Sequence, residues 1–145
     1  MPRLLTFFTL LTMLGCVCLT SCAHDLDRES ALRAGLDRLG GRFTTIVLRP
    51  AVTPADRKAS KRILPTIEVA ELERTPFREG EQVSGRLFFL ESIQIDQESA
   101  VVSGSVGHIP KPDPNSMFGC GTSFSIKLQK VDDRWQPQDV LELSC

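Results

Sequence analysis

The sequence predicts a single α+β domain in which N-terminal helices pack on an antiparallel β-meander of about four to five strands. Two observations favour this fold class. Leu32, Leu36 and Leu39 recur at helical spacing, and Thr53-Pro54 is typical of the start of a second helix. From residue 83 onward, runs rich in β-branched and alternating apolar residues are separated by polar or proline-rich segments, as expected of successive strands.

The first helix is expected to begin at Asp27 or Ser30, because either side chain can cap a helix N-terminus. It should end near Leu39, because Gly40-Gly41 follow directly and glycine favours helix termination. A short strand is then expected from Phe43 to Leu48, where β-branched and apolar residues prevail.

The second helix is expected to begin at Thr53-Pro54, with threonine as the cap and proline in the first helical position. It should end near Leu64, because the residue before a proline disfavours helical backbone angles. The segment from Thr66 to Leu72 fits either a strand or a helix, and its pattern leaves both open.

Two long segments then predict the first pair of the meander. Val83 to Ile95 predicts one strand that bends at or near Gly85. Ala100 to Val106 predicts the returning strand after a polar turn.

The longest irregular stretch runs from His108 to Gly121 and includes three prolines, so we expect an exposed loop. Met117 and Phe118 place two large apolar side chains near its end. These side chains either fold back onto the core or form a partner-binding tip, and both interpretations remain open.

The C-terminal segment, from Thr122 to Leu143, predicts a β-hairpin. If Asp132-Asp133 form its two-residue turn, Phe124 faces Leu141 and Thr122 faces Leu143. Pro137 lacks an amide hydrogen and can force a bulge that shifts this register.

The N-terminal residues have the layout of a secretory signal peptide. Arg3 precedes an apolar run from Leu4 to Leu19, and small residues and Cys22 follow. Leu19-Thr20-Ser21-Cys22 resembles the lipobox of bacterial lipoproteins. The resemblance implies that Cys22 is acylated, with chains such as palmitate, and becomes the first residue of the mature protein. A soluble secreted protein is one alternative. A membrane-spanning anchor is another, although the run is shorter than the roughly 20 residues a span needs.

This interpretation divides the chain into a signal peptide (1–21), a tether (22–27) and one domain (28–145). The resemblance further implies an exported, membrane-anchored lipoprotein. Because Ala23 and not aspartate follows Cys22, the sorting rule of enteric bacteria implies the outer membrane, facing the periplasm.

The remaining cysteines favour a structural disulfide. Cys120 and Cys145 are the two that neither the signal peptide nor the lipid accounts for, and exported compartments are oxidising. The hairpin register that follows from an Asp132-Asp133 turn also sets these two cysteines opposite each other. A redox or metal role is the alternative, but the chain has no C-x-x-C motif and only two histidines.

The arrangement of helices before a long meander resembles the cystatin-like or NTF2-like superfamily of small exported lipoproteins. So does the C-terminal part, in which Lys127, Lys130, Asp132-Asp133 and Trp135 precede a final strand. The resemblance implies a cone-shaped fold with a pocket between helix and sheet, and it implies no particular catalysis.

Motifs for chemistry are scarce. The chain has no G-x-S-x-G motif and no phosphate-binding glycine loop, and 17 basic against 18 acidic side chains give no reason to expect nucleic acid. A carboxylate cluster is formed by Glu68, Glu71 and Glu73, and it fits a solvated strand or helix face, with a glycosidase-type pair as the alternative. Arg57, Lys58, Lys61 and Arg62 form a basic helix face, which is either ordinary surface or a contact for anionic headgroups.

Two classes of function are therefore expected. The first is a non-catalytic interaction or accessory module of the envelope, such as an assembly factor or an inhibitor of an exported enzyme or toxin, without a cofactor or a metal. Its partners would be the membrane, through Cys22, and another envelope protein. The second is a small-ligand-binding NTF2-like pocket protein or a vestigial enzyme, and a deep polar cavity would favour it.

Overall fold

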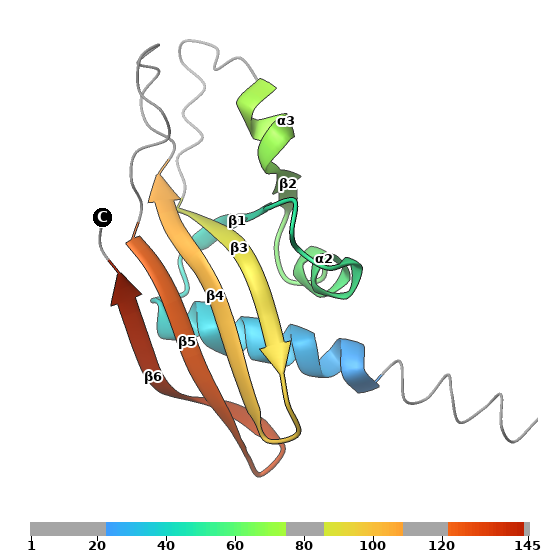
Figure 1. Ribbon diagram of the computed structural model, residues 1–145, viewed down its shortest axis with the longest axis vertical. Helices are drawn as coiled ribbons and strands as arrows, with labels where there is room; N and C mark the ends of the chain where they lie inside the picture. Colours follow the sequence, from blue (N-terminus) through green and yellow to red (C-terminus); the bar gives the residue numbers. More distant parts are fainter. Residues whose placement is uncertain (1–22, 75–85, 109–121, 144–145) are drawn as a thin grey trace, which may run out of the picture.

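The computed structural model describes residues 23–74, 86–108 and 122–143 (Figure 1). A long N-terminal helix, residues 23–38, lies across one face of a six-stranded sheet whose order is β2-β1-β3-β4-β5-β6. The labelled elements are β1 (Phe43–Leu48), α2 (Pro54–Lys61), β2 (Thr66–Glu68), α3 (Val69–Arg74), β3 (Arg86–Ile95), β4 (Ser99–His108), β5 (Thr122–Val131) and β6 (Arg134–Leu143). The fold is α+β, as the sequence predicts.

The sheet differs from the predicted one in strand number and direction. Strands β3 to β6 form the expected antiparallel meander, but β1 pairs in parallel with both β2 and β3, so the sheet is mixed. Strand β1 is central to this half of the sheet, with Ile46 in the main core and Val47 in a second cluster on the opposite face. Burial on both faces is typical of interior parallel strands. The ambiguous segment from Thr66 onward supplies both the edge strand β2 and the helix α3.

The main core fills the space between the N-terminal helix and the sheet. Leu32 from the helix, Val102 from β4 and Ile126 from β5 are all fully buried in it. The helix lies close to the sheet at Gly35, where an added Cβ would be in ordinary van der Waals contact with Val102 Cβ at 3.4 Å. These three side chains belong to one cluster, so the helix and the meander form one packed unit.

Local signals are confirmed at two helix ends, namely Gly40-Gly41 and Thr53. Gly40 and Gly41 have φ angles of 97° and 58°, and the Gly41 N–H donates to the Leu36 carbonyl as in a Schellman ending. Thr53 caps α2, and its side chain accepts a hydrogen bond from Asp56 N. The α2 helix ends at Lys61, slightly earlier than expected.

The start of the N-terminal helix is the exception. It is already helical at residue 23, so residues 23–27, which were expected to form part of a tether, belong to the folded domain. Asp27 lies inside the helix and does not cap it. Its carboxylate instead accepts hydrogen bonds from Lys130 and Trp135, which are distant in sequence.

The hairpin between β5 and β6 has the predicted turn. Asp132 and Asp133 have φ angles of 50° and 59°, which is the left-handed pair that a two-residue type I′ turn requires. The predicted irregularity at proline is also present: Leu128 pairs with Pro137, but Lys127 pairs with Asp139. One extra residue in β6 therefore forms a bulge.

Because of this bulge, the predicted register is wrong for the C-terminal half of β6. Leu141 pairs with Ser125 and not with Phe124, and Leu143 pairs with Ser123 and not with Thr122. The prediction of direct opposition between Cys120 and Cys145 relied on the unshifted register and loses this geometric support. Both cysteines lie outside the described residues, and their disulfide stays a prediction.

Candidate functional site

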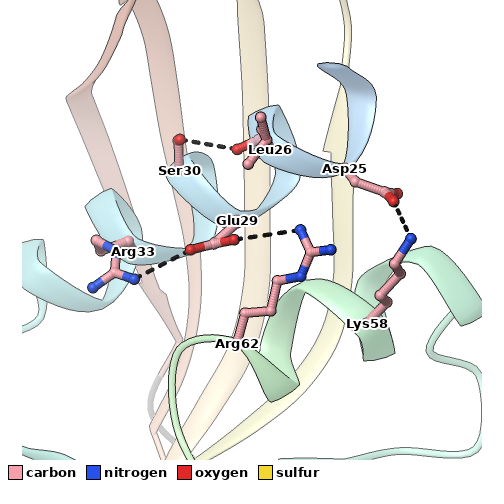
Figure 2. A network of polar contacts seen from close by, with 7 residues as sticks. All are labelled: Asp25, Leu26, Glu29, Ser30, Arg33, Lys58 and Arg62. Carbon is pink, nitrogen blue, oxygen red and sulfur yellow. Dashed lines mark hydrogen bonds and ion pairs between the residues drawn. The ribbon is translucent and has the colours of Figure 1, made fainter. Parts of the chain in front are cut away.

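Ion pairs join the N-terminal helix to α2 (Figure 2). Lys58 donates to Asp25 at 2.5 Å, and Arg62 lies 3.8 Å from Glu29, which also accepts a hydrogen bond from Arg33. In each helix the paired residues are four apart, so they lie on one face and one turn apart. Two complementary charge pairs therefore align the two helices side by side.

This arrangement of charges affects the Asp25 carboxyl. The hydrogen bond from Lys58 lowers the pKa of the Asp25 carboxyl, and the positive charges of Lys58, Arg62 and Arg28 act in the same direction. Desolvation opposes them without reversing the shift. The carboxylate form of Asp25 is therefore favoured by the folded structure.

A buried ion pair lies beneath this surface network. Asp56 of α2 is 1% exposed, and its carboxylate accepts a hydrogen bond from Arg28 of the N-terminal helix. The same Arg28 nitrogen donates to the carbonyl of Ile93 in β3 at 2.8 Å. Because a buried carboxylate is stable only when it is paired, Arg28 ties the helix, α2 and the sheet together. No buried side-chain nitrogen or oxygen in the described part of the chain lacks a hydrogen-bond partner.

A third contact holds the other side of the helix. Asp27 accepts hydrogen bonds from Lys130 Nζ at 2.9 Å and from Trp135 Nε1 at 3.2 Å. Lys130 Nζ also lies 5.4 Å from the centroid of the Trp135 ring, within range of a cation–π interaction. The first turns of the helix are thus fixed to both α2 and the β5–β6 hairpin.

The predicted basic helix face is largely paired with carboxylates. Arg57 bonds to Glu68, while Lys58 and Arg62 contact Asp25 and Glu29. Lys61 is exposed and takes part in no ion pair among the described residues. Contact with anionic headgroups stays a prediction, and the structure adds a definite intramolecular role for three of the four cations.

Sequence reasoning missed the acidic partners of these cations. Asp25 and Glu29 share the spacing of Lys58 and Arg62, and this matched spacing was the available signal. Nothing comparable in the sequence links Arg28 to Asp56, because the pairing depends on how the two helices cross.

A small surface pocket adjoins the C-terminal end of the N-terminal helix. Its volume is about 150 Å³. Exposed Arg33 and Asp37 lie at its rim, and Leu36 and Phe43 are buried beneath it. The complete lining is Arg33, Leu36, Asp37, Gly41, Phe43, Ile63 and Leu64. Sites for drug-sized ligands usually have volumes of about 300 to 1,000 Å³, so this pocket is suited only to a side chain or a very small molecule.

The opposite face of β4 to β6 is polar and open in the described structure. Ser103 pairs with Ser125 across the strands, and their hydroxyl oxygens lie 3.2 Å apart. Leu141 and Leu143 follow on the same face and are 49% and 71% exposed. Leu72 of α3 belongs to the second buried cluster, together with Val47 of β1 and Leu87 of β3.

The remaining predicted site residues lie outside the described residues. They are Cys22, Cys120, Cys145, Met117 and Phe118. Within the residues that are described, no group of histidine, cysteine, aspartate and glutamate side chains is arranged to hold a metal ion. In the same ranges, no helix has the length and apolar character to cross a membrane.

Comparison with known proteins does not place the chain in a family. No protein-family model, no curated protein and no solved structure matches it. Functional inference therefore depends on the residues and their geometry.

Proposed function

We propose that the protein is a lipid-anchored envelope protein that acts as a non-catalytic interaction or accessory module. Cys22 would carry the lipid, and the domain would face the periplasm from the outer membrane. The support for the anchor is the signal-peptide layout that ends at Leu19-Thr20-Ser21-Cys22. The module would act on another envelope protein, as an assembly factor or as an inhibitor of an exported enzyme or toxin.

The observation that favours an interaction module is the filled interior. Leu32, Val102 and Ile126 are fully buried between the helix and the sheet, which is where a cone-shaped fold would hold a ligand. The surface pocket of about 150 Å³ is well below the usual size of a ligand site. A finer assignment to the cystatin-like or NTF2-like folds is part of this proposal. It is supported by the helix packed on the β3–β6 meander, whereas the parallel pairing of β1 departs from the expected meander.

The anchor is tested by replacing the lipidated residue. Cys22→Ala is expected to abolish incorporation of labelled palmitate and to leave an uncleaved or mis-sorted precursor. Cys18→Ala is the matched control, because this cysteine lies within the signal peptide and its loss should leave lipidation intact. The proposal is wrong if the wild type takes up no palmitate and Cys22→Ala still fractionates with membranes after a carbonate wash.

The accessory role is tested by cross-linking the anchored protein in intact cells before purification. Recovery of a second envelope protein in a defined ratio is expected. Recovery of the chain alone, together with saturable binding of a small molecule to the purified protein, would instead support the pocket-protein alternative.

A further inference from the structure

The folded domain begins directly after the residue proposed to carry the lipid. Ala23, which follows Cys22 in the sequence, is already helical. Asp25 is ion-paired to α2, and Asp27 is hydrogen-bonded to β5 and β6. Asp25 follows Cys22 by only three residues, so the chain between the anchor residue and the first fixed side chain spans at most about 11 Å. A domain connected this closely has little freedom to move away from the bilayer.

Charge distinguishes the two sides of this end of the domain. On one side, α2 presents Lys61, which is exposed, and Lys58, whose side chain is 57% exposed despite its ion pair (Figure 2). On the other side, the β5–β6 turn presents Asp132 and Asp133, which are both exposed (Figure 1). The exposed Arg134 beside this turn offsets part of its negative charge, so an anionic bilayer surface favours the first side over the second.

An exposed apolar side chain lies in the first turn of the helix that α2 contacts. Leu26, one turn from the start of the helix, is 57% exposed and is among the few large apolar side chains exposed in the described residues. Figure 2 shows it on the helix that Lys58 contacts through Asp25. Interfacial contacts typically combine such an apolar group with neighbouring lysines.

We propose that the domain is held against the membrane in one orientation, with Leu26, Lys58 and Lys61 facing anionic lipid headgroups. This inference rests on the proposed lipidation of Cys22. The short connection and the Lys58–Asp25 ion pair keep α2, which carries Lys61, next to the anchored end of the helix, and the surface potential decays over about 8 Å at physiological ionic strength. The acidic turn at Asp132 then faces away from the bilayer, and so does the open face of β4 to β6.

Lysine acetylation of the full, lipidated protein in vesicles of phosphatidylglycerol and phosphatidylethanolamine tests the orientation. Lys61 is the reporter, and Lys127, which is exposed on the open face of β5, is the internal control. A variant with a flexible Gly-Ser linker of about twelve residues inserted between Cys22 and Ala23 extends the connection by about 20 Å without altering the domain. Mass spectrometry gives the Lys61 to Lys127 acetylation ratio and the lipid on Cys22.

We expect the ratio to be about fivefold lower in the wild type than in the linker variant, as a headgroup contact near one lysine implies. Equal ratios, with the lipid present on Cys22 in both proteins, would overturn the orientation and leave the anchor intact. Absence of lipid on Cys22 in the wild type would instead overturn the proposed function, and the orientation with it.

Discussion

The two faces of the β4–β6 sheet differ in what covers them. On one face the N-terminal helix buries Leu32 completely against Val102 and Ile126, and ion pairs at Asp25 and Arg28 fix the helix in place. On the other face, serine hydroxyls and the half-exposed Leu141 face outward. The difference indicates that the helix-bearing face supplies most of the stability. The open face is therefore free to carry side chains that stability does not dictate.

The largest difference between the faces is expected from the same substitution made on each. Leu32→Ala removes a fully buried side chain from the core and should lower the free energy of unfolding by about 2 to 5 kcal/mol. Leu141→Ala, on the open face, should lower it by less than about 1 kcal/mol. Urea denaturation of the mature protein measures both. Equal losses would show that the open face is also packed against something.

The buried ion pair should give the next largest effect. Arg28→Ala leaves the Asp56 carboxylate buried without its cation, and we expect a loss of about 2 to 4 kcal/mol because Arg28 itself is partly exposed. Arg33→Ala is the matched control, since its exposed pair with Glu29 should contribute about 0.3 to 0.5 kcal/mol. A double-mutant cycle with Asp56→Ala separates the pair from other contacts. A loss no greater than that of Arg33→Ala would contradict this account.

Two glycines of β4 provide a smaller comparison between the faces. An alanine Cβ at Gly104 would lie 2.5 Å from the Phe89 carbonyl and 2.6 Å from the Phe88 ring, so Gly104→Ala should destabilise by about 1 to 3 kcal/mol. At Gly107 the nearest atom, at 2.8 Å, belongs to the Phe89 ring, which is only partly buried and can turn away. Thermal denaturation should therefore rank Gly107→Ala as the milder variant. The reverse order would show that the Phe89 ring is held more firmly than its exposure indicates.

The smallest effect should be a pH dependence of stability that arises from the ion pair between Asp25 and Lys58. Because the folded structure lowers the pKa of Asp25, its contribution is complete above the unfolded value of about 3.9 and is lost as the pH falls below it. Urea midpoints measured between pH 7 and pH 3 should therefore fall less steeply for Asp25→Asn than for the wild type. Lys58→Met should have the same effect, because it removes the main cause of the shift. If the urea midpoints of all three proteins fall in parallel with pH, the Asp25–Lys58 ion pair is excluded as a source of acid sensitivity.

Signals that act between neighbouring residues predicted their structures well. Thr53 caps a helix, Gly40-Gly41 end one, and Asp132-Asp133 form a two-residue turn. The strand from Phe43 to Leu48 has the predicted bounds. Each of these features depends on the backbone preferences of a few adjacent residues, which a sequence displays directly.

Features that depend on distant partners were predicted less well. The parallel pairing of β1 with β3 joins segments that are separated by two helices, and no local pattern specifies its direction. The sequence predicts that Pro137 can force a bulge. Only the observed strand pairing shows that the bulge places Leu141 opposite Ser125. Similarly, aspartate is a favoured residue at a helix N-cap, yet Asp27 lies inside the helix. There its carboxylate accepts hydrogen bonds from Lys130 and Trp135.

The sequence by itself determined the fold class, the cap at Thr53, the helix end at Gly40-Gly41, the turn at Asp132-Asp133 and the expectation of a lipid anchor at Cys22. The tertiary structure decided that the residues directly after Cys22 belong to the domain, and that Lys58 and Arg62 pair with Asp25 and Glu29. The physical reason is the sequence separation over which each interaction acts. Backbone preferences act over a few residues, whereas an ion pair between Lys58 and Asp25 joins residues 33 positions apart and forms only when both helices are buried against the same sheet.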